Sequence, residues 1–217
     1  MVTNLSKKHS LITNWISELR NNEIQGDRMR FRRNLERIGE AIAYEISKKL
    51  PWQEKEIQTP LGTHNSKVLT DQPVLATILR AGLPLHQGLL NYFDYADNAF
   101  ISAYRKHRRD GSFMINLEYL SSPSLENRVL IICDPMLATG ASVAAALQAL
   151  KGSGTPSQIH IVTAIASSVG IEYVIREFGE NLYIWCGDID DELTAKGYIV
   201  PGLGDAGDLA FGPKTQF

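Results

Sequence analysis

Residues 129–150 read Val-Leu-Ile-Ile-Cys-Asp-Pro-Met-Leu-Ala-Thr-Gly-Ala-Ser-Val-Ala-Ala-Ala-Leu-Gln-Ala-Leu and set the frame for the whole chain. The first five are apolar and mostly β-branched, which is typical of a strand buried on both faces. Pro135 has no N–H to donate to a sheet, so the strand is expected to end beside it. A turn of small residues at 138–142 then leads into an alanine-rich helix. This combination predicts several backbone N–H groups and the positive end of a helix dipole around one anion-sized space.

Asp134 lies where a loop built only for phosphate would not carry a carboxylate, since like charges repel. The acid fits a ligand that also presents hydroxyl donors, as a ribose does. The residues therefore predict a sugar-phosphate site, with the phosphate on the turn and the hydroxyls on Asp134. The sequence has no Gly-Lys-Ser/Thr run of the nucleoside triphosphate loop. The alternative is an ordinary strand-to-helix turn capped by Thr139 or Ser142.

Composition excludes several classes of protein. The 217 residues include 44% apolar and 21% charged residues, which is enough apolar sequence for a normal core. A net charge of −2 gives no global reason to expect nucleic acid or an anionic membrane as a partner. Cys133 and Cys186 lie in apolar runs, so we expect buried free thiols and neither a disulfide nor a metal site. With no membrane-length apolar run and a polar beginning, a cytoplasmic location is expected.

The first 72 residues have a different pattern from the rest. Apolar residues at helical spacing predict a helix that ends at Asn21 and a longer one, carrying Phe31, that is stopped by Pro51. Two extended pieces around residues 60–62 predict a peripheral hairpin. We expect a single domain, 1–217, in which residues 1–72 pack as helices and hairpin on a core formed by residues 73–217.

From Pro73 onward, strands and helices alternate. Strands are expected at 73–79, 99–104, 113–120, 129–133, 159–165 and 182–186, and helices at 83–92, after the 138–142 turn and around 171–178. This alternation predicts a doubly wound, mainly parallel α/β sheet with right-handed crossovers. Ligands of such sheets bind at the carboxyl ends of the strands, where Arg80, Arg105 and Asp134 are each expected directly after a strand.

The segment 198–208 interrupts this alternation with three glycines, one proline and two acids. A loop of this composition is either an ordinary connection or shaped to expose backbone groups to a ligand. The apolar residues Ile199, Val200, Leu203 and Phe211 favour a loop that is anchored to the core.

Four motifs, taken together, resemble the uracil phosphoribosyltransferase family. They are Leu-Arg-Ala-Gly at 79–82, Tyr-Arg at 104–105, Asp-Pro-Met-Leu-Ala-Thr-Gly-Ala-Ser at 134–142 and Gly-Tyr-Ile-Val-Pro-Gly-Leu-Gly-Asp-Ala-Gly-Asp at 197–208, in the order of the family. The resemblance implies the type I phosphoribosyltransferase variant of the doubly wound sheet. It also implies a salvage reaction in which uracil and 5-phosphoribosyl 1-diphosphate give UMP and diphosphate, normally with Mg²⁺ carried by the diphosphate.

The resemblance also implies the roles of individual residues. The residues expected to bind phosphoribosyl diphosphate are Arg80, Arg105, Asp134, Pro135, Met136, Leu137, Ala138, Thr139, Gly140, Ala141, Ser142 and Asp205. Those expected to bind uracil, through backbone groups that match its imide edge, are Ile199, Gly204, Asp205 and Ala206. Arg105 and Asp205 are the expected catalytic residues, and Asp205 as general base is a hypothesis. No residue is expected to form a protein metal site.

Three positions depart from the family pattern. Ala141 replaces a usual glycine, and its methyl group is tolerable if the backbone there is right-handed helical. The basic segment 105–112 replaces an acidic arm, and is either a lid over the diphosphate or a solvated hairpin tip. Residues 83–88 also depart locally from the usual sequence, and His86 within them is expected to pack within its helix and not to take part in catalysis.

Two other functions stay open from the sequence. A phosphoribosyltransferase for another base would share the donor site, and the loop at 204–206 favours uracil over other bases. An RNA-binding regulator on the same fold would need a basic face, which the net charge disfavours. We further expect a homo-oligomer, on the interpretation that Trp15 and Phe31 are exposed, and GTP is a candidate activator because it activates some relatives.

Overall fold

A computed structural model describes residues 1–107, 113–179 and 181–214, with the backbone but not the side chains of residues 103–107 and 113–117. Across these residues one sheet runs through the molecule in the order β1-β10-β9-β7-β4-β5-β6, and β8 pairs with β9 off this path. The strands are β1 (Val2–Asn4), β4 (Val74–Leu79), β5 (Asp97–His107), β6 (Phe113–Ser121), β7 (Val129–Cys133), β8 (Met136–Leu137), β9 (Gln158–Ser167) and β10 (Leu182–Asp190). Only the β5–β6 pair is antiparallel among the described strands of this sheet. The predicted doubly wound, mainly parallel sheet is confirmed.

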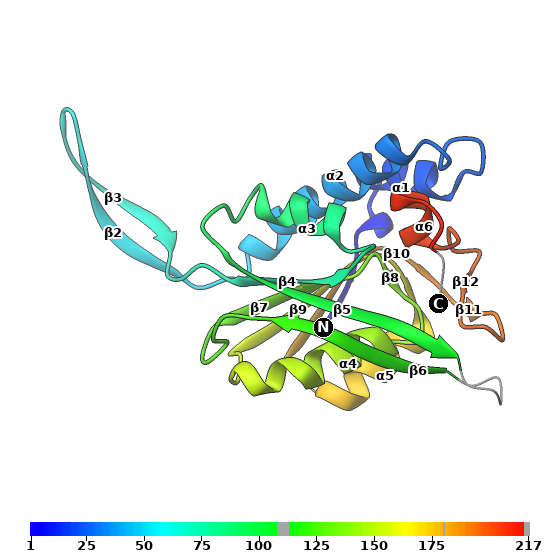
Figure 1. The fold of residues 1–217 in the computed structure, drawn as a ribbon. Coiled ribbons are helices and arrows are strands. Elements are labelled where there is room, and N and C mark those ends of the chain that lie inside the picture. Colours follow the sequence, from blue (N-terminus) through cyan, green and yellow to red (C-terminus); the bar gives the residue numbers. More distant parts are fainter. Residues whose placement is uncertain (108–112, 180, 215–217) are drawn as a thin grey trace.

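The strand order reverses between the neighbouring strands β4 and β7, and in doubly wound sheets such a reversal opens a crevice outside the carboxyl ends of the two strands. From β4 the chain proceeds to β5 on one side, whereas from β7 it proceeds through β9 to β10 on the other. The connections leave on opposite faces: α3 (Leu83–Leu90) lies above the sheet and α4 (Ala141–Leu150) below it (Figure 1). Doubly wound sheets bind ligands at such a switch point, outside the carboxyl ends of the strands. Residues 80 and 134 follow the two strands that border this crevice.

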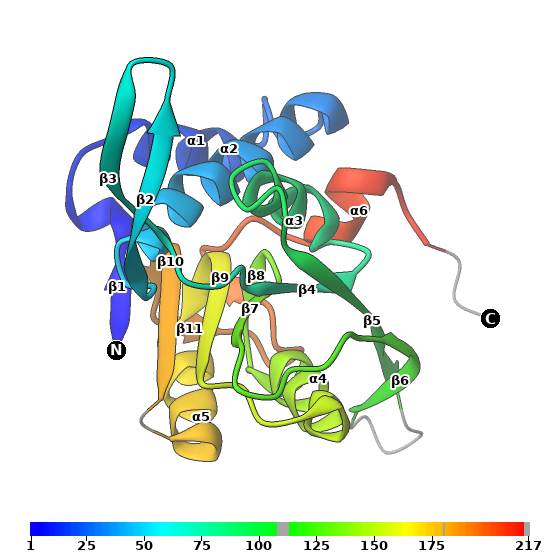
Figure 2. The same ribbon diagram turned by 90° about the vertical axis from the view of Figure 1, so that its left-hand side faces the viewer.

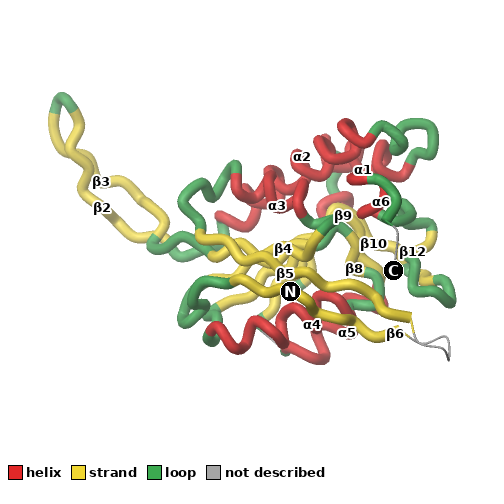
Figure 3. The backbone as a smooth tube through the Cα atoms, in the orientation of Figure 1, coloured by secondary structure: helices red, strands yellow, loops and turns green. Residues whose placement is uncertain are grey.

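Helices cover both faces of the sheet (Figure 3). The upper layer contains α1 (Leu11–Arg20), α2 (Arg28–Ser47), α3 and α6 (Ala206–Phe211), and the lower layer contains α4 and α5 (Ser168–Phe178). Ile38 and Ile42 of α2 are wholly buried in one core with Leu75 and Ile131 of the sheet. Full burial of each such side chain contributes roughly 1.5–3 kcal/mol. The N-terminal helices therefore form part of the main core.

Two glycines allow α2 and α3 to pack with their backbones almost in contact. A Cβ at Gly39 would collide with the carbonyl of Leu85, and one at Gly88 with the carbonyl of Glu36. Any larger residue at either position would push the helices apart. This contact fixes α3, and with it the loop that joins β4 to α3, against the upper layer.

The hairpin of β2 (Trp52–Thr59) and β3 (Gly62–Leu69) projects away from the body of the molecule (Figures 1 and 2). Its strands pair antiparallel along their full length, and Leu61 at the tip is fully exposed. The predicted peripheral hairpin is confirmed, as are the two N-terminal helices.

Two sequence predictions are wrong. Arg105 does not follow β5 but lies within it, opposite Ile115, because antiparallel pairing with β6 prolongs β5 beyond the parallel part of the sheet. Phe31 is not exposed: only 1% of its surface is accessible, because it faces the core side of α2. Trp15 is partly buried against the same core.

The described helices include none long and apolar enough to cross a membrane.

Candidate functional site

The turn between β7 and α4 has the shape of an anion site. Gly140 takes a left-handed conformation with φ 78°, and a Cβ there would come within 2.8 Å of the Tyr173 ring and 3.1 Å of the Gly170 carbonyl oxygen. Glycine is therefore required at this position. Gly140 also stands at the N-cap of α4, where no described side chain caps the helix. The first-turn N–H groups and the helix dipole are thus directed at the space in front of the turn.

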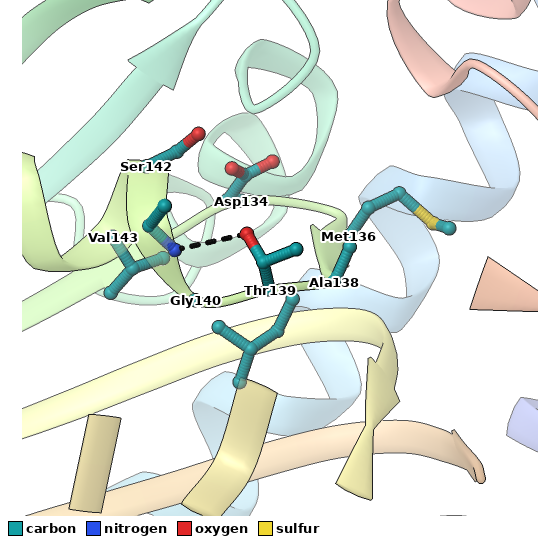
Figure 4. Close-up of a pocket in the computed structure, with 9 residues that line it drawn as sticks. Asp134, Met136, Ala138, Thr139, Gly140, Ser142 and Val143 are labelled. Carbon is teal, nitrogen blue, oxygen red and sulfur yellow. Dashed lines mark hydrogen bonds between the residues drawn. The ribbon is translucent and has the colours of Figure 1, made fainter. Parts of the chain in front are cut away.

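The N-cap residue of α4 is Gly140, which has no side chain, and the alternative of a turn capped by Thr139 is borne out only for the first N–H of the helix. The Thr139 hydroxyl accepts a hydrogen bond from the Ala141 N–H at 3.3 Å (Figure 4). Ala141 is the first residue of α4 and has right-handed helical geometry. Its methyl group in place of the usual glycine therefore costs no backbone strain, as predicted.

Neighbouring strands and helices hold this turn from below. The Ser167 hydroxyl donates to the Ala138 carbonyl and accepts from the Gly170 N–H at 2.9 Å. The Pro135 carbonyl accepts from the N–H groups of Ala164 and Ile165 at 3.1 and 3.0 Å. The turn is thereby fixed to β9 and to the start of α5 before any ligand arrives.

A small pocket lies in front of the turn (Figure 4). Its lining residues are Asp134, Met136, Leu137, Ala138, Thr139, Gly140, Ala141, Ser142 and Val143. The side chains of Asp134 and Ser142 project on the same side of the turn. The pocket therefore gathers the residues of this stretch that were predicted to bind phosphoribosyl diphosphate. Pro135 is the exception, because it is buried and does not line the pocket.

Arg80 emerges beside this turn, at the carboxyl end of β4. Two residues later, a Cβ at Gly82 would lie 2.7 Å from the Ile78 carbonyl oxygen and 3.0 Å from that of Cys133. The loop of residues 80–82 is therefore pressed against the end of β7, one residue before Asp134. The peptide bond between Leu79 and Arg80 is cis.

The C-terminal loop reaches the same edge of the sheet. It contains β12 (Ile199–Val200), which pairs with β11 (Glu192–Leu193), and leads into α6. Gly202 and Gly204 have positive φ angles of 55° and 94°, which favour glycine. Ile199 and Ala206 are buried, whereas Gly204 is exposed. The predicted anchoring holds for Ile199 and Leu203, which are each 4% exposed, but not for Val200 and Phe211, which are 37% and 38% exposed.

Helix α6 and its contact with Arg80 were not predicted. Asp205 caps the helix by accepting from the Asp208 N–H at 3.0 Å. The Asp208 carboxylate in turn accepts from Arg80 Nη2 at 3.2 Å, and both side chains are partly exposed. An acid followed three residues later by a second acid is a recognised helix-start pattern, so the sequence did contain this signal. The ion pair brings the loop of residues 80–82 and the C-terminal loop together.

Asp205 lies close to this contact. A Cβ at Gly207 would lie 3.2 Å from Asp205 Oδ1 and 3.8 Å from Arg80 Nη2. Burial raises the pKa of Asp205, but the hydrogen bond from the Asp208 N–H and the ammonium group of Lys214, at 3.3 Å, outweigh it and lower that pKa. A carboxylate with a lowered pKa stays ionised at neutral pH and is a weak proton acceptor.

Other predicted residues lie outside the site or outside the described part of the chain. His86 is buried, hydrogen-bonds Asn98 Oδ1 at 2.8 Å and has its pKa lowered by burial, which fits the predicted packing role. Both thiols are free and buried, and burial raises the pKa of each to about 12. The side chain of Arg105 and the basic residues 108–112 lie outside the described residues, so the lid hypothesis is untested.

The family resemblance implies Mg²⁺ carried by the diphosphate. In residues 1–107, 113–179 and 181–214, side chains of His, Cys, Asp and Glu form no group of three that could hold a metal. Mg²⁺ is commonly bound through one or two carboxylates together with substrate phosphates. The carboxylates at the carboxyl edge of the sheet suit that arrangement better than an all-protein cage.

The family model described as uracil phosphoribosyltransferase matches this chain over residues 6–213. The chain belongs to the uracil phosphoribosyltransferase family. A curated relative of that name from Porphyromonas gingivalis is 52% identical over 98% of this chain and 99% of its own length. Another, from Methanothermobacter thermautotrophicus, is 41% identical over 86% of this chain and 85% of its own.

A solved structure supports the same fold. A protein from Aquifex aeolicus superposes with a TM-score of 0.86 and 31% identity, over 98% of both chains. The family predicted from the four motifs is confirmed, and with it the phosphoribosyltransferase class of the doubly wound sheet.

Proposed function

We propose that this protein transfers the phosphoribosyl group of 5-phosphoribosyl 1-diphosphate to uracil, giving UMP and diphosphate in pyrimidine salvage. The observation that carries the proposal is the Arg80–Asp208 ion pair, which joins the edge that bears the sugar-phosphate turn to the loop that bears α6. A donor site and an acceptor site therefore share one crevice. The relatives named uracil phosphoribosyltransferase supply the identity of the base.

The turn 139–142 holds the 5′-phosphate in this proposal. Its N–H groups and the dipole of α4 favour an anion, and Gly140 permits close approach. Asp134 accepts hydrogen bonds from the ribose hydroxyls at the lower end of the crevice. Met136, Leu137 and Ala138 support the turn, since Leu137 and Ala138 are buried and Met136 is partly buried.

Arg80 holds the diphosphate, and its ion pair with Asp208 keeps the guanidinium in place before the donor binds. Its side chain is 42% exposed, so a diphosphate can reach it and compete with Asp208. Guanidinium matches paired phosphate oxygens and keeps its charge. Arg105 supplies a second guanidinium in the proposal, from within β5. Mg²⁺ bound to the diphosphate would neutralise part of its charge.

The reaction forms the bond between uracil N1 and ribose C1′ and breaks the bond from C1′ to the diphosphate oxygen. The bonding electrons leave with the diphosphate, whose growing negative charge the two arginines stabilise. The N1 proton of uracil is released to the solvent. Because Asp205 is a weak proton acceptor, we propose that it acts in catalysis as a fixed anion that orders the loop and faces the positive charge developing on the sugar.

Uracil binds to backbone groups of Ile199, Gly204 and Ala206. Its imide edge presents acceptor, donor and acceptor, which backbone N–H and C=O groups can complement. Cytosine has a different pattern and would leave buried groups without partners, a mismatch that can discriminate by roughly 10⁴-fold. The glycine at 204 leaves space above the loop, since Leu209 is the one described residue within 4 Å of a Cβ placed there.

Three further statements belong to the proposal. Residues 1–217 form one domain, because α1 and α2 share a core with the sheet. The cytoplasmic location and the homo-oligomer stay part of the proposal; the buried Phe31 gives the oligomer no support, and sedimentation of the purified protein would test it. Activation by GTP would be tested by adding GTP at subsaturating uracil.

The direct test is UMP formation from labelled phosphoribosyl diphosphate, Mg²⁺ and a single base. We expect UMP with uracil and less than about 10⁻³ of that rate with cytosine. Hypoxanthine, guanine and adenine serve as parallel substrates, because another base would use the same donor site. Nucleotide formed faster from any of them would overturn the assignment of uracil, and no nucleotide from any base would overturn the transfer reaction.

A further inference from the structure

Arg20, the last residue of α1, reaches the carboxyl end of β10. Its Nη1 and Nη2 donate to the two carboxylate oxygens of Asp190, both at 2.8 Å, and Nη2 also donates to Asp188 Oδ2 at 3.0 Å. The Asp190 side chain is 7% exposed and that of Arg20 is 19% exposed. This is a bidentate, largely buried ion pair, and such pairs fix geometry strongly.

The same pair holds one peptide unit of the C-terminal loop. Arg20 Nη1 donates to the Gly202 carbonyl at 2.9 Å, and the Gly202 N–H donates to Asp190 Oδ2 at 3.0 Å. Both backbone polar groups of Gly202 are therefore bound by one charged pair. A Cβ on Gly202 would collide with the Ile199 carbonyl, so the turn is closed tightly on residue 199.

We infer that Arg20 and Asp190 are positioning residues that set the backbone of residues 199–206 for base recognition. The inference rests on the proposed function, in which that backbone binds uracil. The glycines at 202, 204 and 207 give the backbone of this segment more conformational entropy to lose on folding than other residues would. Recognition through backbone groups requires that freedom to be removed, and the charged pair removes it at Gly202.

A second ion pair of α1 provides a matched control. Arg30 of α2 donates from Nε and Nη2 to Glu18 of α1 at 2.8 and 2.7 Å, which is also bidentate. It attaches the same helix, and among the described residues its hydrogen bonds go to Glu18 and not to residues 199–206. If a variant acts only by loosening α1, substitutions of Arg20 and of Arg30 should have the same effect on the kinetics. If it acts by releasing the loop, only the substitution of Arg20 should have that effect.

The experiment compares Arg20→Lys with Arg30→Lys in the full-length protein. Lysine keeps the charge beside Asp190 but lacks the planar fork that serves Asp190 and Gly202 together. For Arg20→Lys we expect the KM for uracil to rise roughly tenfold and the KM for phosphoribosyl diphosphate to stay within about twofold. Hydrogen exchange at the Gly202 amide should be faster in Arg20→Lys and unchanged in Arg30→Lys. Should Arg20→Lys fail to fold, Asp190→Asn is measured in the same way.

Gly204→Ala separates the failure of this inference from failure of the proposed function. If UMP still forms but Gly204→Ala leaves the KM for uracil unchanged, the loop does not bind the base and this inference is overturned, whereas the proposed function is overturned only if the unaltered protein forms no UMP. If Gly204→Ala raises that KM but the Arg20 or Asp190 variant does not, the loop binds the base and the positioning role is wrong. Equal effects of Arg20→Lys and Arg30→Lys on both substrates would also overturn it.

Discussion

The turn between β7 and α4 takes its pocket-lining residues from one continuous stretch, whereas the loop between β12 and α6 takes its shape from distant parts of the chain. Gly140, Thr139 and Ala141 make their turn with each other, and β9 and α5 only support it. Gly202 is held by Arg20, which lies 182 positions earlier. A site can thus combine a half that is encoded locally with one that exists only once the chain has folded.

The largest effect is expected when the local half is broken at its glycine. Gly140→Val places a branched side chain on a left-handed residue and against Tyr173 and Gly170. The loss of fit at the phosphate should lower kcat/KM for phosphoribosyl diphosphate by about 10²-fold or more. Steady-state UMP formation measures it, and Gly152→Val, where a Cβ meets nothing within 4 Å, is the control. Equal kinetics of the two variants would contradict the assignment of the turn.

Arg80→Gln tests the contact between the two halves. The change removes a charged donor from the diphosphate and from Asp208, so kcat/KM for phosphoribosyl diphosphate should fall by about ten- to a hundredfold. Binding of UMP, which has no diphosphate, should change much less and can be measured by calorimetry. Arg176→Gln, at an exposed position with 69% of its side chain accessible, is the control. A weaker UMP affinity with unaltered donor kinetics would place Arg80 elsewhere in the site.

Gly204→Ala strains the remotely shaped half without filling its space. At φ 94° an L-residue is disfavoured by about 1–2 kcal/mol, and the new methyl group has room. The KM for uracil should rise by up to about tenfold, because about 1.4 kcal/mol corresponds to a factor of ten. Gly62→Ala in the hairpin, at φ 152° and with nothing within 4 Å, imposes strain far from the site. If both variants altered uracil kinetics alike, the effect would come from general destabilisation.

Substitutions of Asp205 should have the smallest effect, a change in the free energy of unfolding that separates the helix cap from the charge. Asp205→Ala removes the cap of α6 and should cost about 1 kcal/mol, whereas Asp205→Asn keeps a capping oxygen and loses only the charge. The charge contribution should be under about 1 kcal/mol because Lys214 and Asp205 are both partly exposed.

The pH dependence has a definite sign. The pKa of Asp205 is lower in the folded protein than its ordinary 3.8, so its contribution to stability is present above that value and is lost as the pH falls through the folded pKa. Urea unfolding at several pH values should show the gap between wild type and Asp205→Asn closing in acid. A gap that widened in acid would show that the charge of Asp205 is unfavourable in the fold.

The same contrast explains what could be predicted from sequence. β7, the turn and α4 are each determined by neighbouring residues, so the positions of Asp134 and Gly140 can be predicted from the sequence alone. The Arg80–Asp208 and Arg20–Asp190 pairs join residues far apart in the chain, and nothing local to Arg20 distinguishes it from other helix-ending arginines. The prediction that Arg105 follows β5 was wrong for the same reason: the end of β5 is determined by its pairing with β6, a separate segment of the chain.

Phe31 and α6 illustrate two other limits. Periodicity placed Phe31 on the apolar face of its helix, but the extent of the layer covering that face depends on how α2 packs with α3. Helix α6 has six residues, too few for an apolar period to emerge, so only its capping acid could have revealed it.

Cys133 closes β7 one residue before Asp134, and its S–H points to the Gly82 carbonyl. With its pKa raised to about 12 the thiol stays protonated at physiological pH, and the thiolate is the form that oxidants and alkylating agents attack. The sequence has one other cysteine, Cys186, whose thiol is equally buried. Electrophilic compounds therefore have no nucleophilic sulfur to capture beside this crevice. An inhibitor designed for it must obtain its affinity from reversible contacts with the arginines and the backbone.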